Sequence, residues 1–181
     1  MSDRFGVVAT EPLLSSFVFD VVRNSVSGLG QEFTRDVVVH KGAVGIVAQR
    51  ADGRVGLLRQ YRAAFDAEIW EIPAGTLDVE GEPLLEAAQR ELAEELGASA
   101  RTWLHLGTYM VSPGWTNQVM HLFKATELEL FTSAPEGPEE TAMSVHWLTL
   151  DEIKDLLTSD EPLDYSLSMG LVQSFGAKVL D

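Results

Sequence analysis

The sequence predicts an α+β fold, arranged as an α/β/α sandwich in which helices flank a mixed β-sheet, with an antiparallel β extension at the N-terminus. Short runs rich in β-branched and aromatic residues, separated by Gly-containing turns, fill the first part of the chain. One amphipathic helical segment then interrupts the strands, and further strands and two helical segments follow it. No internal repeat and no linker divides the sequence further.

The expected strands are bounded by turn residues such as the Ser-Gly-Leu-Gly and Ala-Asp-Gly segments. They cover residues 17–23, 33–40, 43–49, 55–61, 103–111, 118–125 and 142–148, and one more strand ends near Ile72. A Pro-, Gly- and Glu-rich loop is expected at residues 133–140, and short helices are expected at residues 151–157 and 165–175. The central helix is expected to pack on the sheet that these strands form.

The central helix begins at Pro83 and ends before Gly97, because proline suits a first helical position and glycine suits the residue after a helix. Glu82 and Glu86 place negative charge near the positive end of the helix dipole. Apolar residues at spacings of three and four predict one stripe that faces a core. That stripe comprises Leu85, Ala88, Leu92 and Leu96.

Three carboxylates, Glu91, Glu94 and Glu95, lie in the last turns of this helix, where the dipole disfavours negative charge. Each like-charged pair one turn apart costs about 0.2–0.5 kcal/mol, and no Lys or Arg in that turn offsets the cost. A hard divalent cation such as Mg²⁺, which prefers carboxylate and phosphate oxygens, would stabilise the cluster. The alternative is a solvated acidic helix face.

Composition narrows the classes of function. The chain has 181 residues, of which 45% are hydrophobic and 23% charged, as expected for one globular domain. With 13 basic and 28 acidic residues, its net charge of −15 argues against binding nucleic acid, and a phosphorylated substrate would need local cations. The absence of Cys excludes disulfides, thiolate zinc sites and Cys nucleophiles. No membrane span or signal-peptide pattern is visible, so a cytoplasmic location is expected.

The segment Arg90-Glu-Leu-Ala-Glu-Glu-Leu-Gly97 is followed by Ala98, and seven residues separate it from Glu82 upstream. This pattern resembles the box motif of the Nudix hydrolase superfamily. The first half of the motif departs from the family pattern, because six residues instead of five separate Gly75 from Glu82. A one-residue insertion in a loop costs little free energy. It leaves Glu80 as an alternative to Glu82 for the glutamate of the motif.

Three further segments resemble the ADP-ribose pyrophosphatase branch of that superfamily. They are Arg59-Gln-Tyr-Arg62, Trp70-Glu-Ile-Pro-Ala-Gly75 and Ser112-Pro-Gly114, in which Pro113 lies sixteen residues after Gly97. After the Ser-Pro-Gly turn this branch often has an acidic residue, whereas the chain has Thr-Asn-Gln at residues 116–118. The substrate preference is therefore left open.

The resemblance implies a set of site residues. Glu91 and Glu95 would be the main metal ligands, with Glu94 assisting and the Ala74 carbonyl completing the shell around two or more Mg²⁺ ions, or Mn²⁺ in their place. Arg90 is expected to grip Glu82 and support the site, because its planar guanidinium suits a bidentate contact with a carboxylate. The general base is expected in the acidic loop, with Glu140 first, Glu139 second and Glu136 third. Arg35, Arg62 and Pro113 would bind substrate, and Phe17, Phe19 or Phe33 would stack on a base.

The expected function is Mg²⁺-dependent cleavage of ADP-ribose, a small nucleoside diphosphate derivative, to AMP and ribose 5-phosphate. Residues 41–181 would form the Nudix hydrolase domain, and residues 1–40 would form an extension that makes a homodimer. Two alternatives stay open: a Nudix hydrolase of another nucleotide sugar such as GDP-mannose, and a non-catalytic nucleotide-sensing Nudix domain. The sequence contains no Gly-x-Ser-x-Gly, P-loop or Gly-x-Gly-x-x-Gly motif, and its four His residues lack metal-binding spacing.

Overall fold

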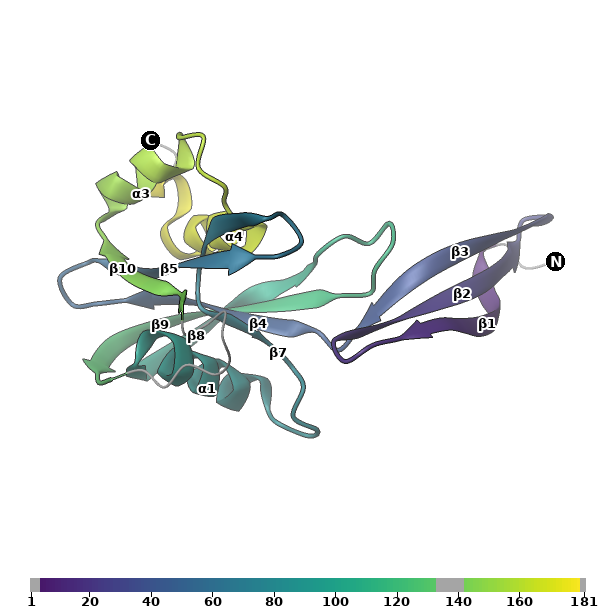
Figure 1. Ribbon diagram of the computed structural model, residues 1–181, viewed down its shortest axis with the longest axis horizontal. Coiled ribbons are helices and arrows are strands. Elements are labelled where there is room, and N and C mark those ends of the chain that lie inside the picture. Colours follow the sequence, from purple (N-terminus) through teal and green to yellow (C-terminus); the bar gives the residue numbers. More distant parts are fainter. Residues whose placement is uncertain (1–3, 133–141, 180–181) are drawn as a thin grey trace. The chain divides into compact units, whose positions relative to one another are not determined.

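The computed structural model describes residues 4–132 and 142–179, which fall into two compact units (Figure 1). The first unit comprises residues 1–42 and 109–120, and the second comprises residues 43–108 and 121–181.

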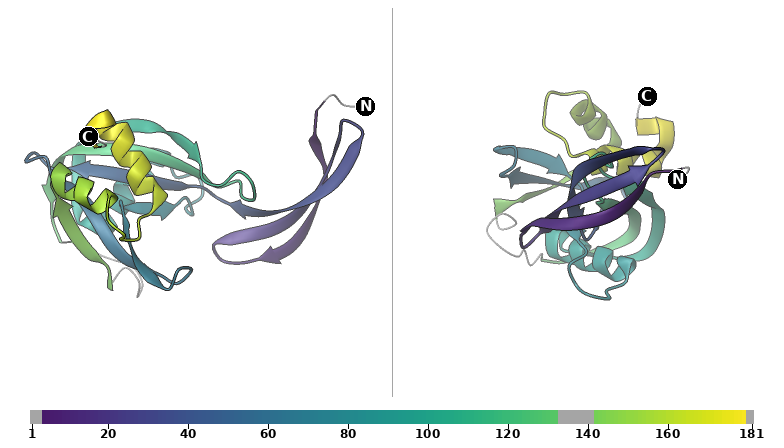
Figure 2. Two further views of the ribbon diagram at one scale, coloured as in Figure 1. Left: turned by 90° about the horizontal axis from the view of Figure 1, so that it is seen from above. Right: turned by 90° about the vertical axis from the view of Figure 1, so that its right-hand side faces the viewer.

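The second unit is built on a sheet whose strands follow the order β10-β5-β4-β9-β8, with β6 paired to β5 and β7 paired to β4. The strands are β4 (Ala43–Gln49), β5 (Val55–Arg62), β6 (Ala67–Glu71), β7 (Ala74–Thr76), β8 (Ala98–Met110), β9 (Val119–Leu130) and β10 (Ser144–Leu148). The helices are α1 (Leu84–Leu96), α3 (Leu150–Leu157) and α4 (Tyr165–Phe175), with a 3₁₀ turn η1 (Gly176–Val179) after α4. Helix α1 covers one face of the sheet, and α3 and α4 cover the other (Figures 1 and 2). This is the expected α+β sandwich on a mixed sheet.

Helix α1 packs against β4 and β7, and its buried stripe joins a core cluster that also contains Leu58 of β5. Ala88, Leu92 and Leu96 are buried as the spacing predicted, but Leu85 is 39% exposed, so its assignment to the stripe was wrong. Ala87 is buried instead, because the stripe is centred between the columns 87-91-95 and 88-92-96. The buried face of α1 therefore includes the positions of two of its glutamates.

The first unit contains a three-stranded antiparallel sheet in the order β1-β2-β3, with β1 (Gly6–Ser15), β2 (Phe19–Gly28) and β3 (Gln31–His40). The loop between β8 and β9 belongs to the same unit and is bound to β3. The Val38 N–H donates to the Trp115 carbonyl at 2.9 Å, and the Asn117 N–H donates to the Val38 carbonyl at 3.2 Å. The His40 N–H also donates to the Asn117 side chain at 2.8 Å.

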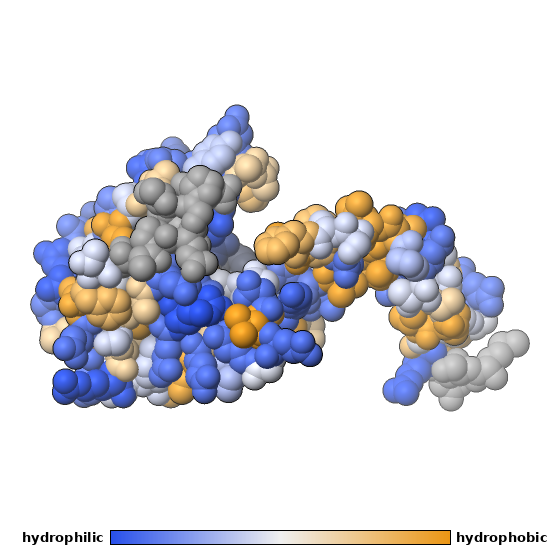
Figure 3. Space-filling model, turned by 60° about the horizontal axis from the view of Figure 1, so that its bottom comes forward, coloured by the Kyte–Doolittle hydropathy of each residue, from blue (hydrophilic) through white to orange (hydrophobic). Residues whose placement is uncertain are grey.

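Hydrophobic side chains are exposed along this three-stranded sheet (Figure 3). Every residue of β1 is exposed, including Val8 at 67% and Leu14 at 55%. Strand β1 was missing from the expected strands, and it contains Pro12, a residue type that argues against a strand interior. The structure accommodates Pro12 beside a register shift in an edge strand, where proline is tolerated.

Across the described residues, no helix is long and apolar enough to cross a membrane.

Candidate active site

Helix α1 places two carboxylates in the interior of the second unit. Glu91 is 7% exposed and Glu95 is 4% exposed, and they lie one turn apart on the buried face of the helix. The helix ends at Gly97, which adopts a left-handed conformation (φ 59°) and donates its N–H to the Ala93 carbonyl at 3.1 Å. No basic residue occupies the last turn, as the sequence predicted. Burial of two acidic side chains implies specific partners around them.

The first partner is the backbone of β7, which begins within the Trp70–Gly75 segment, at Ala74. The Ala74 N–H donates to the Glu95 carboxylate at 2.8 Å. Gly75 lies so close to Glu91 that a β-carbon at this position would overlap the Glu91 carboxylate. Only glycine leaves room for that carboxylate, so the Gly of the motif has a steric role. The expected loop at Gly75 is instead the short strand β7, paired to β4.

The second partner is Arg90, which donates to Glu82 at 3.2 and 3.3 Å, to Glu91 at 2.7 Å and to Glu94 at 3.1 Å. The expected Arg90–Glu82 pair is present, and Glu82 is the residue that the motif favoured over Glu80. Arg90 also lies 3.7 Å from the carboxylate of Asp78. The hydrogen bond with Glu82, followed by attraction to the other glutamates, raises the pKa of Arg90 above its ordinary value. Arg90 is therefore a permanent cation that holds the acidic cluster together.

The donor set fits a hard divalent cation. Glu91, Glu94 and Glu95 offer carboxylate oxygens from one helix, and the guanidinium of Arg90 supplies one positive charge to several negative ones. Within the part of the chain that the structure describes, no group of three acidic, His or Cys side chains converges as a ready-made metal cage. Binding a cation here would draw Glu91 or Glu94 away from Arg90.

Arg62, at the end of β5, forms a forked ion pair with Glu71 at the end of β6, with Nε 2.8 Å from the carboxylate. The Glu71 side chain is 8% exposed, whereas Arg62 is 38% exposed. Glu71 belongs to the Trp70–Gly75 segment, but sequence reasoning did not single it out. The antiparallel register pairs Arg62 with Ala67 and Glu71 with Leu58, so the ion pair joins residues that are not direct cross-strand neighbours, and no local signal in the sequence predicts it.

Two other expected substrate-binding residues, Arg35 and Pro113, belong to the first unit. The Arg35 guanidinium lies 4.5 Å from the centre of the Phe33 ring, and its Nη1 donates to the Thr34 carbonyl at 2.8 Å. Pro113 is exposed in the β8–β9 loop. The structure thus brings together the α1 residues, Glu82 and Ala74, and it places Arg35 and Pro113 in the other unit. The base candidates Glu136, Glu139 and Glu140 lie outside the described residues.

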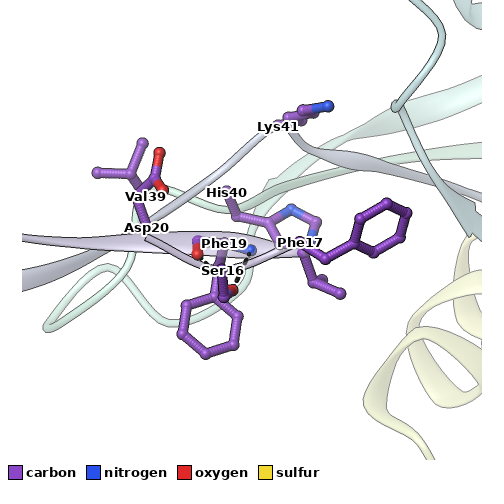
Figure 4. A pocket seen from close by; sticks show the side chains of 8 residues that line it. Ser16, Phe17, Phe19, Asp20, Val39, His40 and Lys41 are labelled. Carbon is purple, nitrogen blue, oxygen red and sulfur yellow. Dashed lines mark hydrogen bonds between the residues drawn. The ribbon is translucent and has the colours of Figure 1, made fainter. Parts of the chain in front are cut away.

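The first unit also contains a pocket at the turn between β1 and β2, lined by Phe17, Phe19, His40 and Lys41 among others (Figure 4). Its volume is about 160 Å³. The rings of Phe17 and Phe19 point in different directions, and Phe17 is 97% exposed (Figure 4). Burial lowers the pKa of His40, so this imidazole is neutral at pH 7. Of the three Phe residues proposed for stacking, Phe33 already packs against Phe5 at 5.2 Å, and Phe17 is the most accessible.

Comparison with known proteins agrees with this geometry. The model of the NUDIX domain family matches residues 39–168. The chain is 36% identical over 149 residues to an ADP-ribose pyrophosphatase of Mycobacterium tuberculosis, covering 82% of the chain and 72% of that relative. It is 32% identical over 158 residues to an ADP-ribose pyrophosphatase of Bacillus subtilis, covering 87% of the chain and 85% of that relative. A crystal structure of an ADP compounds hydrolase superposes with a TM-score of 0.80 at 22% identity, covering 96% of this chain and 94% of that one, which supports the fold.

Proposed function

The chain belongs to the Nudix family of pyrophosphatase hydrolases, and we propose that it cleaves ADP-ribose to AMP and ribose 5-phosphate with Mg²⁺ bound at the α1 carboxylates. The observation that carries the proposal is the arrangement around Glu91 and Glu95. Both are buried, one beside Gly75 and one bonded to the Ala74 N–H. A site that only stabilised the fold would not need acidic side chains on the buried face of a helix.

Glu91, Glu95 and Glu94 would hold the cations, and the Ala74 carbonyl would complete the shell. Bound cations neutralise the diphosphate and lower the pKa of a coordinated water. Arg90 supports the site because its bond to Glu82 keeps it beside Glu91 and Glu94. Its positive charge limits the repulsion between these two carboxylates before a cation binds. Gly75 lets the Glu91 carboxylate lie against the backbone. The number of cations is proposed as two or more, with Mn²⁺ as an alternative ion.

We assign proton removal from the attacking water to Glu140, with Glu139 as the second choice and Glu136 as the third. A carboxylate that takes this proton lets the water oxygen bond to phosphorus while the bond to the bridging oxygen breaks. Arg62 is assigned to the substrate phosphates, because Glu71 orients its guanidinium while more than a third of the side chain stays exposed. Arg35 and Pro113 are assigned to the remainder of the substrate.

We further propose a homodimer formed through the first unit. Its sheet exposes apolar side chains such as Val8 and Leu14, which a second copy would remove from water. Phe17 is the residue that we assign to stacking on the adenine, since its ring is the most exposed of the three candidates. The cytoplasmic location stays a prediction.

The experiment that tests the proposed activity is a substrate panel measured with the purified chain in Mg²⁺ and in EDTA. We expect AMP and ribose 5-phosphate from ADP-ribose in Mg²⁺ and no product in EDTA. Faster release of GMP from GDP-mannose would identify GDP-mannose as the substrate in place of ADP-ribose and would leave the reaction class unchanged. Binding of ADP-ribose without any product from the panel would contradict catalysis and indicate a sensing domain.

A further inference from the structure

We propose that the second unit has a further ligand site, a pocket between the β5–β6 turn and the start of α4. It binds an uncharged aromatic heterocycle carrying amino-group donors, as a nucleoside base does. The pocket has a volume of about 670 Å³. Its walls include Arg62, Phe65, Ile69, Glu71, Leu163 and Tyr165. It contains none of the α1 carboxylates, and it shares one residue, Arg62, with the substrate site of the proposed function. The inference does not otherwise rest on that function.

The pocket is preformed, because hydrogen bonds fix both of its walls. Residues 162–164 lie along the edge of β6, where the Trp70 N–H donates to the Pro162 carbonyl at 2.9 Å and the Asp164 N–H donates to the Trp70 carbonyl at 2.9 Å. Asp164 then caps α4 by accepting from the Ser166 N–H at 2.8 Å. A ligand would therefore bind without having to order this wall.

The opposite wall, the β5–β6 turn, is fixed in the same way. The Phe65 N–H donates to the Arg62 carbonyl at 3.0 Å, and the Tyr61 hydroxyl donates to the Asp66 carboxylate at 3.0 Å. Asp66 adopts a positive φ of 50°, so the turn is a specific conformation held by these contacts.

The lining suits a flat ring. Most of it is apolar, and two aromatic side chains come from different elements: Phe65 from the turn, 75% exposed, and Tyr165 from the start of α4, 39% exposed. Burial, together with the charge of Asp164, raises the pKa of Tyr165 to about 12, so its phenol stays uncharged at neutral pH. Aromatic faces that are accessible from a concave surface stack on heterocycles of any base.

The polar groups decide the charge of the ligand. Glu71 is 6% exposed and lines the pocket, and Asp164 adds a second carboxylate, while Arg62 is bound to Glu71. A phosphate would pair with Arg62, as the proposed function assigns, whereas a neutral ring with an exocyclic amino group would donate to the carboxylates of Glu71 and Asp164.

The test is a titration of the ¹⁵N-labelled chain with adenosine in EDTA, followed through amide chemical shifts. We expect saturable shifts at residues 62–71 and 163–166. Purine riboside, which lacks the 6-amino group, is the matched ligand and should bind about tenfold more weakly, because the bond to a carboxylate is lost.

The variant Phe65→Ala should weaken adenosine binding about fivefold or more, because stacking is lost at a position too exposed to matter for folding. Phe131→Ala is the matched control, since Phe131 is 51% exposed in the same unit but does not line the pocket. Shifts confined to other residues, or equal binding by Phe65→Ala and the unaltered chain, would overturn the inference. Loss of adenosine binding in Phe17→Ala alone would overturn it too, while supporting the role proposed for Phe17. Absence of ADP-ribose hydrolysis would contradict the proposed function and leave this result untouched.

Discussion

The two units of the chain differ in how far their apolar side chains are buried. In the second unit Ile46, Leu57, Leu58 and Ile72 are fully buried between the sheet and its helices. In the first unit, Met120 is the one apolar side chain that counts as buried among the described residues. Its three-stranded sheet is held by strand pairing and by surface contacts such as the Arg23–Asp36 pair at 2.7 Å.

The difference shows which unit can hold buried charge. A packed core fixes backbone and side chains closely enough to keep Glu91 and Glu95 against β7. Any gain or loss of a contact in such a core changes its packing and stability. A sheet with exposed apolar residues does not provide such an environment, but it offers surface for another copy of the chain. We therefore assign the chemistry to the second unit and association to the first.

The variant Glu95→Gln tests the role of the second unit most severely. It keeps the size of the side chain but removes a charge that the proposed cations need, so turnover of ADP-ribose should fall by about 10³-fold or more. Circular dichroism should show an unchanged fold. The control Glu86→Gln alters an exposed glutamate of the same helix and should have normal activity. Near-normal turnover by Glu95→Gln would exclude it as a ligand.

The variant Glu140→Gln asks whether the acidic loop supplies the base. Its catalytic rate should fall by about 10²–10⁴-fold with little change in Mg²⁺ affinity, because only proton removal is affected. Rate measurements at saturating substrate, combined with calorimetric Mg²⁺ titrations, separate the two effects. If Glu139→Gln is the damaging variant and Glu140→Gln is not, the base is the neighbouring residue.

The variant Gly75→Ala tests the steric role of glycine in the site. The added methyl group would displace the Glu91 carboxylate, and a misplacement of this kind should cost about 10²-fold in kcat/KM. Gly6→Ala serves as the comparison, because a β-carbon there meets nothing within 4 Å in the first unit. Equal activity of the two variants would mean that Glu91 can move without consequence.

Paired substitutions Val8→Asp and Leu14→Asp test the role given to the first unit. Both residues are exposed in β1, so charges there should leave the fold of one copy intact while opposing burial against a second copy. Light scattering should show the mass fall from that of a dimer to that of a single chain. Leu104→Asp, at a 59% exposed position on the second unit, should keep the dimer. A single-chain mass for the unaltered protein would contradict the proposal.

Acidification should produce the smallest of the expected effects, a fall in the free energy of unfolding. Burial, and then the nearby charge of His105, lowers the pKa of His121 in the folded state, so the unfolded chain binds a proton first. The contribution of neutral His121 to the free energy of unfolding is fully present above the unfolded pKa of about 6.5. It is lost as the pH falls through the lower pKa of the folded state. Urea unfolding between pH 7 and pH 5 should show a decline that His121→Asn reduces. A decline of the same size in both proteins would assign it to other groups.

Much of this organisation was accessible from the sequence. Strand β4 and helix α4 have the expected bounds, and the Arg90–Glu82 pair follows from the motif that the two residues share and from the donor geometry of arginine. Local patterns carry this information, because helix periodicity and capping act over a few residues. Strand β1 was missed because Pro12 weakens the local signal while pairing with β2 supplies the missing stability.

Contacts between distant segments were not accessible. The overlap that a side chain at Gly75 would have with Glu91, and the Arg62–Glu71 pair, depend on how β7 and β6 are placed by the sheet. The exposure of Leu85 likewise depends on where the first turn of α1 lies relative to the core. Such features require the register and packing of the whole unit.

The capture of divalent cations by α1 is tested most directly by a crystal structure with Mg²⁺ and a non-hydrolysable ADP-ribose analogue. We expect ions about 2.1 Å from carboxylate oxygens of Glu91 and Glu95, with the diphosphate as a further ligand. An analogue bound with no ion at these oxygens, and with Arg90 still holding Glu91, would contradict the assignment of this site.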